Sequence, residues 1–537
     1  MANALPSQIF EQFKGIREYN GVNYGGQISA ISCKNVELFK TDIGGGTGIR
    51  TVSGDKVFVN LPSGYKAIKN FSATLNGISF FFIYGENAER GALFYVSGRE
   101  TVELTLDGLT FEINNKCNGL TMAYGENDLF VFTNGKQAVS VVRSGNSFEL
   151  RKIEAVDNKG RPLEWLSMTE WNGFLVVASK YGVHSSAKNN IYQWNDTITE
   201  ENRLIASWYI EFGKRVTAVK SFSTGLFMFT DSDCSYINTT PNDIENAVRQ
   251  NVAMNGCFSF ESLTAHDTYL FFYDDNQKGV FYIQMTDTGQ TRPVGSVTKE
   301  VQSFFTGTIN TCKMYSCIYD EYNEIWLLVN DKVLVYDYIH QEFIERDMHP
   351  ITSVCKHDNN IYVCNDLYED VEQADGTIKT VLKNGRVLIE KMSETFDGTY
   401  IPAEYTTSII NMGSNSNLKK QKTPILLVLN ENAINNFYVE ITANFKTKNP
   451  KHIKLKVGNE GVWADETEGV EITDNMLWDN MRWTDESAYK KRVVEISTPQ
   501  TWYTMSIRFF TKEQGDGFSI VSMEMKRLKE KTKTKGR

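Results

Sequence analysis

Acidic residues recur in pairs along the middle of this chain, and paired carboxylates can hydrolyse glycosidic bonds. In that chemistry one carboxyl group protonates the leaving oxygen while the other acts as nucleophile or base. Each pair lies at the turn end of a hairpin-like segment, where an Asp side chain accepts hydrogen bonds from nearby backbone N–H groups. Turn capping is therefore the preferred interpretation. The residues are Asp231 and Asp233, Asp274 and Asp275, and Asp320 and Glu321.

Other residues that could bind metals or attack substrates lack a recognised spacing. Asp231-Ser-Asp233 begins like a calcium loop, but the later ligands and the glycine are missing. HExxH, GxSxG and CxxC do not occur, although a triad can assemble from distant positions. We therefore predict no catalytic, cofactor-binding or metal-binding residues, and no cofactor. The scattered histidines are His184, His266, His340, His349, His357 and His452.

A glycine-rich loop near the N-terminus could cradle a phosphate group. Its glycines are Gly44, Gly45, Gly46 and Gly48. No Lys-Ser/Thr pair follows them, and the next residues, IRTV, are typical of a strand and not of a helix start. We expect a loop that joins two strands.

Several large aromatic residues lie close together in the sequence: Trp165, Trp171, Trp194, Trp208 and Tyr209. If exposed, they could stack on sugars. Burial is the preferred interpretation, because aromatic side chains supply much of the apolar area of a protein core.

The cysteines and the N-terminus indicate a cytoplasmic site of synthesis. The chain has 8 cysteines; Cys355 and Cys364 flank one turn and could face each other, but buried free thiols are preferred. The N-terminus has neither a basic start nor an apolar run. No apolar stretch approaches the roughly 20 residues that span a bilayer. We expect a soluble protein.

Length and charge set further limits. A chain of 537 residues accommodates more than one domain of roughly 150 residues. The net charge of −10 argues against a protein that grips nucleic acid by neutralising phosphates. It does not argue against one that lets nucleic acid slide past.

One local pattern recurs along the chain: a strand, a tight turn of Asn, Gly or Asp, and a second strand rich in Val, Phe and Tyr. Recurrence every 40 to 55 residues or so indicates the blades of a β-propeller. We predict an all-β fold, with a propeller of about six to seven blades. The copies are residues 71–85, 120–135, 167–182, 218–233, 262–276, 316–331 and 354–367.

Outside this repeat the character of the sequence changes. Strands without the blade period follow residue 400 and predict a separate C-terminal β-sandwich. An insert between them carries Trp463, Trp478 and Trp483, and the end of the chain is a basic tail. We expect an N-terminal segment over 1–65, the propeller over 66–400, the sandwich over 401–527 and the tail over 528–537. The tail could bind nucleic acid or an acidic protein surface, or be a solvated, disordered end.

Two short helices are expected as excursions between blades. Thr240 is a plausible N-cap before Pro241, with Ile244, Ala247, Val248 and Val252 on one face and Gly256 at the stop. Thr199 could cap a second helix before Glu200 and Glu201.

The order of these features resembles the nozzle, or packaged-DNA stabilisation (tail tubular), proteins of short-tailed bacteriophages. The similar segments are residues 42–60 with Gly45 to Arg50, residues 189–238, residues 255–284 with Gly256-Cys257, and residues 404–413, 419–429, 505–510 and 517–525. The resemblance runs from about residue 30 to residue 527 and depends on their order. The Trp463–Trp483 insert and the Lys-rich tail have no counterpart in it.

The resemblance implies a structural virion protein that is not an enzyme. Such proteins form a ring, usually of six copies, below the portal and adaptor, and its bore retains double-stranded DNA and then conducts it into the host without sequence recognition. A bore that must not hold DNA favours an acidic or neutral wall. The insert and the tail could dock adaptors, tail fibres or other tail proteins. The alternative is a propeller that binds or cleaves glycans, and a propeller hub ranks last because WD and kelch signatures are missing.

Overall fold

The structure is a computed structural model, and it divides the chain into two compact units. The propeller unit is Asp55–Ile339 with Met348–Ser393; the sandwich unit is Met1–Gly54, His340–Asp347 and Glu394–Arg537. The described residues are all except 1, 5–7, 19–21, 24–26, 42–44, 115, 126, 146, 244–248, 286–290, 320–321, 373–376, 394, 397, 413–416, 422, 431–434, 455–491, 500, 527 and 532–537. The Trp463–Trp483 insert therefore lies outside the description.

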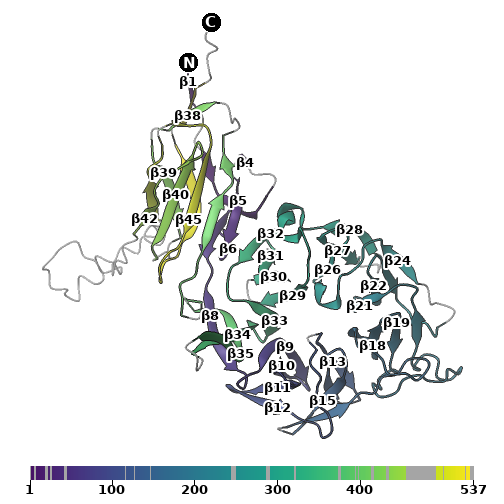
Figure 1. Cartoon of the computed structure of the whole chain (residues 1–537). Helices are drawn as coiled ribbons and strands as arrows, with labels where there is room; N and C mark the ends of the chain where they lie inside the picture. The colour runs from purple at the N-terminus through teal and green to yellow at the C-terminus, as the bar shows by residue number, and fades with distance from the viewer. Residues whose placement is uncertain are drawn as a thin grey trace, which may run out of the picture. The chain divides into compact units, whose positions relative to one another are not determined.

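The propeller unit consists of antiparallel sheets that follow one another around a common centre (Figure 1). Its first five blades are four-stranded. Their strands are β9 (Lys66–Leu75), β10 (Ile78–Glu86), β11 (Gly91–Ser97) and β12 (Glu100–Leu104) in blade 1; β13 (Asn118–Tyr124), β14 (Asn127–Thr133), β15 (Ala138–Ser144) and β16 (Ser147–Lys152) in blade 2; β17 (Ser167–Trp171), β18 (Phe174–Ser179), β19 (Gly182–Ser185) and β20 (Tyr209–Glu211) in blade 3; β21 (Val216–Phe222), β22 (Gly225–Thr230), β23 (Cys234–Ile237) and β24 (Gln250–Ala253) in blade 4; and β25 (Leu263–His266), β26 (Tyr269–Asp274), β27 (Gly279–Met285) and β28 (Thr291–Ser296) in blade 5.

Two further blades complete the ring, which makes seven among the described residues. Blade 6 is β29 (Cys312–Tyr319), β30 (Tyr322–Val329) and β31 (Lys332–Asp337). Blade 7 is β33 (Ile351–His357), β34 (Asn360–Glu372) and β35 (Ile378–Ser393), with β8 (Gly54–Asn60) as its outer strand. The predicted all-β propeller is thus confirmed, and an N-terminal strand closes it.

Tight turns set the register of the blade hairpins. Asn76 and Gly77 have φ of 50° and 78° and are the two loop residues between Leu75 and its partner Ile78. A two-residue hairpin needs positive φ at both positions, which Asn-Gly supplies at low cost. The register in turn decides which side chains face the neighbouring blade.

The cores of the propeller unit lie between adjacent blades. The cluster between blades 1 and 2 contains Phe82 and Phe130, whose rings stack at 4.8 Å between centroids. The cluster between blades 7 and 1 contains Ala67, Phe94 and Tyr362. Each blade therefore buries both of its faces only when both neighbours are in place.

The joint between blades 7 and 1 is also rich in hydrogen bonds. The Ala67 N–H donates to Asp366 Oδ1 at 3.0 Å, and the Thr352 hydroxyl donates to the Ala67 carbonyl at 2.6 Å. Gly385 of β35 packs directly on this backbone, so that an added Cβ would overlap the Ala67 nitrogen. The Gly385 carbonyl accepts from the Leu61 N–H at 2.8 Å.

The sandwich unit has two main sheets, and most of their strands have one buried face. One sheet pairs, in order, β42 (Lys451–Ile453), β40 (Phe437–Ala443), β45 (Met505–Phe510), β36 (Glu404–Thr407), β5 (Gln27–Lys34) and β3 (Gln12–Ile16). The other pairs β43 (Arg492–Ile496), β39 (Ile425–Leu429), β46 (Ser519–Met525), β7 (Thr47–Thr51) and β6 (Val36–Lys40). The predicted C-terminal sandwich is confirmed.

The structure assigns the chain ends differently from the boundaries expected from sequence. Strands of the N-terminal segment lie inside the sandwich sheets, since β36 pairs with β45 on one edge and β5 on the other. Residues 340–347, expected in the propeller, belong to the sandwich unit; Glu342 there pairs with Arg17 at 2.7 Å. Unpaired strand edges are unfavourable, and remote strands satisfy them.

The basic tail begins inside a sheet. Strand β47 (Leu528–Lys531) lies between β1 (Ala2–Ala4) and β38 (Leu418–Gln421), with β44 (Thr501–Trp502) next to β38. The first four residues of the expected tail, 528–531, therefore pair with strands from both ends of the chain. Residues 532–537 lie outside the description.

The two expected helices are not supported. Residues 199–206 form turns, in which the Thr199 N–H donates to Asn202 Oδ1 at 2.7 Å and the Asn202 N–H donates to the Thr199 hydroxyl at 3.4 Å. These local bonds compete with helix formation. Val252 lies in β24, while Ile244, Ala247 and Val248 are outside the described residues. The described helices are the 3₁₀ turns η1 (Phe260–Ser262) and η2 (Lys299–Phe305), so among the described residues no helix is long and apolar enough to cross a membrane.

We expect Gly385→Ala to weaken the propeller unit, because the added methyl group meets backbone that cannot rotate away. Overpacking of this kind costs about 1–3 kcal/mol. Chemical denaturation followed by tryptophan fluorescence measures the change in unfolding free energy. Gly213→Ala is the matched control, since an added Cβ there meets nothing within 4 Å. Equal stability of the two variants would contradict a tight closure.

Candidate functional site

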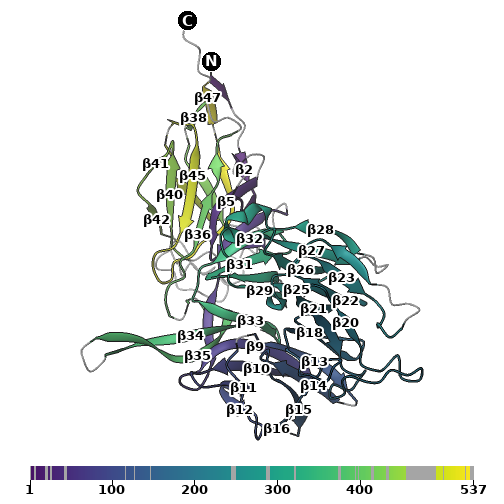
Figure 2. The same ribbon diagram turned by 45° about the vertical axis from the view of Figure 1, so that its right-hand side comes forward.

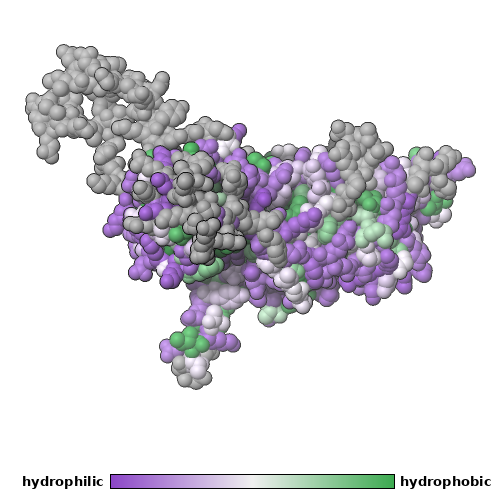
Figure 3. Space-filling view, turned by 90° about the horizontal axis from the view of Figure 1, so that it is seen from above, coloured by the Kyte–Doolittle hydropathy of each residue, from purple (hydrophilic) through white to green (hydrophobic). Residues whose placement is uncertain are grey.

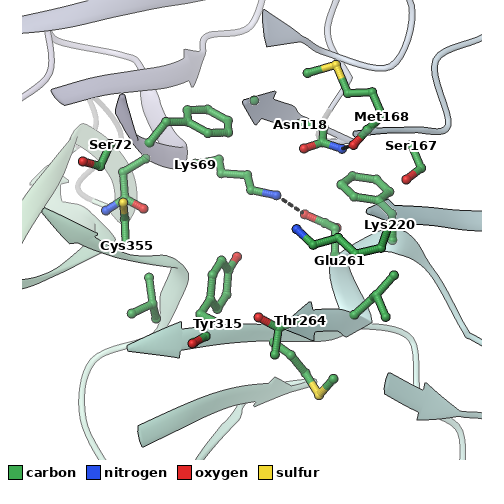
Figure 4. A pocket seen from close by; sticks show the side chains of 18 of the residues that line it. Lys69, Ser72, Asn118, Ser167, Met168, Lys220, Glu261, Thr264, Tyr315 and Cys355 are labelled. Carbon is green, nitrogen blue, oxygen red and sulfur yellow. Dashed lines mark hydrogen bonds and ion pairs between the residues drawn. The ribbon is translucent and has the colours of Figure 1, made fainter. Parts of the chain in front are cut away.

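A cavity of about 370 Å³ lies on the axis of the propeller unit. Residues from the innermost strand of every blade line it, namely β9, β13, β17, β21, β25, β29 and β33, together with η1. Inner strands converge because each blade packs its faces on its neighbours, which leaves the first strand to face the axis. Figure 4 shows Lys69, Lys220 and Glu261 extending into this space.

The charges of the cavity are unbalanced. Lys69, Lys220 and Lys356 line it, whereas Glu261 is the one carboxylate among the described lining residues. Lys69 Nζ donates to Glu261 at 3.3 Å and to the Cys117 carbonyl at 2.9 Å. The nearby Lys313 lies 3.8 Å from the same Glu261 carboxylate.

Lys220 has no such partner. Neither a hydrogen bond nor an ion pair joins its ammonium to another residue in the described part of the chain, and burial lowers its pKa. No neighbouring carboxylate offsets that effect of burial. The cavity thus presents an ammonium group whose positive charge the protein does not compensate.

Two serine–histidine pairs adjoin the cavity. Ser72 Oγ lies 2.9 Å from His357 Nδ1, and Ser316 Oγ lies 2.8 Å from His266 Nδ1. Burial lowers the pKa of both imidazoles, so they are neutral near pH 7 and can accept a proton. His357 Nε2 is 3.6 Å from Asp358, whose side chain is 65% exposed. Solvent screens that contact, and the geometry falls short of a working triad.

Four of the carboxylates singled out from sequence, Asp231, Asp233, Asp274 and Asp275, are described, and they lie at turns away from the cavity lining. Asp274 accepts hydrogen bonds from the N–H groups of Asn276 at 2.8 Å and Gln277 at 3.2 Å, as a turn cap does. Asp275 pairs with Lys278 at 2.7 Å.

Asp231 and Asp233 likewise lie at a turn. Burial opposes ionisation of Asp233, but hydrogen bonds from Lys214 at 2.6 Å and Thr230 at 2.9 Å keep its pKa below the usual value. Asp231 is exposed on the same turn. Asp320 and Glu321 lie outside the described residues.

The tryptophans and the glycine loop singled out from sequence serve the packing and the connections of the fold. Trp165, Trp171, Trp194 and Trp208 are buried between blades, as expected. Tyr209 is only half-buried, in β20. Gly45 and Gly46 precede β7, which pairs antiparallel with β6, so the glycine loop joins two strands.

The eight described cysteines are all free thiols. Cys355 pairs across its hairpin with Tyr362, while Cys364 pairs with Ser353, so these two thiols do not face each other. Among described residues, no group of three or more His, Cys, Asp or Glu side chains could hold a metal ion.

Sequence reasoning missed the axial lysines. The available signal was a lysine inside an inner strand of the repeat, as at Lys69, Lys220, Lys313 and Lys356. When the arrangement of the blades is unknown, the sequence pattern places those lysines on the solvent-exposed face of a half-buried hairpin.

Comparison with known proteins adds little beyond these observations. No family model and no curated protein matches the chain. A crystal structure of the extracellular domain of a one-component system, BT4673, from B. thetaiotaomicron has 10% identity and a TM-score of 0.41, over 78% of this chain and 57% of that one. The chain therefore spans little more than half of that domain.

Two other solved structures are similar at the same level. BBS1N in complex with ARL6DN has 11% identity and a TM-score of 0.35, over 63% of this chain and 96% of that one. A luciferin-regenerating enzyme has 13% identity and a TM-score of 0.29, over 49% and 87%. With every TM-score below 0.5, these likenesses carry no functional argument.

We expect acid to destabilise the propeller unit partly through His184. Burial lowers its pKa to about 4, against about 6.5 in an unfolded chain. The unfolded state then binds a proton that the folded state does not, so stability is lost as the pH falls between these values. Urea denaturation at several pH values should show that His184→Gln removes up to about 3 kcal/mol of this dependence. An unchanged pH dependence would contradict the assignment.

Proposed function

We propose that this protein is a structural component of the tail of a short-tailed bacteriophage, a nozzle whose copies form a ring below the portal and adaptor. In this proposal the ring retains packaged double-stranded DNA and conducts it into the host. Support comes from the order of sequence features that resembles the nozzle proteins, and from the acidic net charge of −10, which disfavours adhesion of DNA to the wall of a bore.

The observation that carries the proposal is a projecting arm with exposed apolar side chains. Strands β34 and β35 extend beyond the blade as a two-stranded hairpin (Figure 2). Tyr368 and Ile378 on this arm are 50% and 72% exposed, and hydrophobic residues gather on the projection (Figure 3). An isolated hairpin that exposes large apolar groups is typical of a contact surface in an assembly.

The register places these groups on one face of the arm. Tyr368 pairs with Leu382, and Glu372 pairs with Ile378. Directly paired residues point to the same side of a sheet, as do alternate residues along a strand. One face therefore carries the apolar side chains of Tyr368, Leu382 and Ile378. Glu372 and the hydrogen-bonded pair Asp370 and Thr380 lie on the same face.

The sandwich unit supplies a second exposed apolar group. Phe445 is 89% exposed in a two-residue turn where Asn444 and Phe445 have φ of 52° and 62°. A bulky residue with positive φ costs about 1–2 kcal/mol. An exposed aromatic ring kept at that cost supports a role in contacts with other subunits or tail proteins.

The axial cavity constrains where DNA would pass. Its volume of about 370 Å³ is that of a small-molecule pocket, which is too small to enclose a length of B-DNA. A conduit for a duplex must therefore be enclosed by several copies and not by the hole of one propeller. Rotational symmetry generates such a bore from identical contacts.

Negative-stain electron microscopy of the purified chain, alone and mixed with a portal–adaptor complex, tests the proposal. Rings, or the docking of several copies below the adaptor, are expected. Persistent monomers that fail to join the complex would refute it. Glycan-array binding by such monomers would favour the alternative of a glycan-acting propeller.

We expect the double variant Tyr368→Ser with Ile378→Ser to lose ring assembly, because it removes the apolar contact of one arm face. Analytical ultracentrifugation should show a shift from oligomer to monomer at unchanged melting temperature. Val371→Ser is the matched control: Val371 lies on the opposite arm face and is 37% exposed. Equal loss of assembly in the control, or none in the double variant, would exclude this face as the contact.

A further inference from the structure

The uncompensated ammonium of Lys220 is the starting point. It enters the axial cavity from β21 (Figure 4), where Lys69, Lys220 and Lys356 face a single described carboxylate, Glu261. That carboxylate is engaged by Lys69 at 3.3 Å and approached by Lys313 at 3.8 Å. Even if Glu261 neutralises one of these lysines, the centre of the ring keeps an excess of positive charge.

Such an arrangement does not stabilise the fold. Lys220 is half-buried. An ammonium partly withdrawn from water without a partner is unfavourable, and an apolar side chain of the same length would avoid that cost. The cavity also has a size found in ligand sites, since its 370 Å³ falls within the range of about 300–1,000 Å³ for small-molecule pockets. Charge and volume together indicate that something anionic completes the site.

The neutral polar groups around the cavity fit the same kind of ligand. Thr264 contributes a hydroxyl group to the lining and Asn118 a side-chain amide, whereas the Ser72 hydroxyl is bonded to His357. The Asn118 amide nitrogen donates to the Met168 carbonyl at 3.2 Å, which holds the side chain at the cavity wall. Hydroxyl and amide donors beside an ammonium are typical of sites for oxyanions.

We propose that the axial cavity binds a small oxyanion, a phosphate or carboxylate group, with Lys220 as its principal counter-ion. Lys356 adds a second positive charge at the wall, while Lys69 and Glu261 form a fixed pair that borders the site. The ligand is a small molecule, because the cavity is too small to enclose a length of nucleic-acid duplex. A neutral sugar would leave the charge of Lys220 uncompensated. The proposal does not depend on ring assembly.

Isothermal titration calorimetry at constant ionic strength tests the site with inorganic phosphate and, separately, citrate. The wild-type chain should bind at least one of them, and the two titrations distinguish a phosphate site from a carboxylate site. Lys220→Met should weaken binding by at least tenfold. The ligand-free Lys220→Met protein should also melt at a higher temperature than the wild type, because it no longer contains an unpaired, half-buried charge.

Two further variants make the result decisive. Lys220→Arg keeps the charge and should retain binding, which separates loss of charge from misfolding if Lys220→Met does not fold. Lys152→Met removes an exposed lysine of blade 2 that pairs with Glu154 and should bind like the wild type. Absence of binding to both phosphate and citrate, or equal binding by wild type and Lys220→Met, would overturn the proposal. Neither result bears on whether the protein forms rings.

Discussion

Closure of the propeller is the constraint on which the rest of the structure depends. Blade 7 takes its outer strand, β8, from a position before blade 1, so the last sheet cannot be completed until both ends of the repeat region meet. The cluster that contains Ala67, Phe94 and Tyr362 buries that joint. The hydrogen bonds of Asp366 and Thr352 to the Ala67 backbone fix its register. A ring closed in this way leaves no blade with a free face.

The axial site is a consequence of the same geometry. Because the cores lie between blades, the innermost strands have one set of side chains that is excluded from those cores and points toward the centre. Small and polar groups there leave a space of about 370 Å³. Lys220 reaches into this space without a carboxylate beside it, whereas Lys69 is held by Glu261. Packing between blades thus accounts for the cavity itself. The excess of lysines over carboxylates in its lining is what supports the proposed anionic ligand.

The two units also divide the mechanical tasks of the protein that we propose. The propeller unit is a closed ring of blades, and its arm extends beyond blade 7 with Tyr368 and Ile378 exposed. The sandwich unit is assembled from both ends of the chain, since β47 pairs with β1 and β38. Termini held in a sheet resist fraying better than free ends do. Both properties suit a tail component that must withstand force while contacting other subunits.

The hairpins and their repeat follow from local features of the sequence. Asn-Gly turns such as Asn76-Gly77 need positive φ, and the alternating strands beside them need a partner sheet, so hairpin, blade and propeller follow from local chemistry. The burial of Trp171 and Trp208 and the turn role of Asp274 were predictable for the same reason, because each depends on neighbours close in sequence. The helix expected at Thr199 failed where side-chain bonds to Asn202 satisfied the turn instead.

The pairings between residues hundreds of positions apart become visible only in the folded chain. Strand β8 completes blade 7, β5 lies beside β36, and residues 528–531 form a strand. The local sequence does not predict these pairings, because a strand can form its hydrogen bonds with any unpaired sheet edge. The cationic cavity belongs to this class. Lys220 and Lys356 are unremarkable in their own hairpins, and their positive charges become a site only where the ring brings the inner strands to one axis.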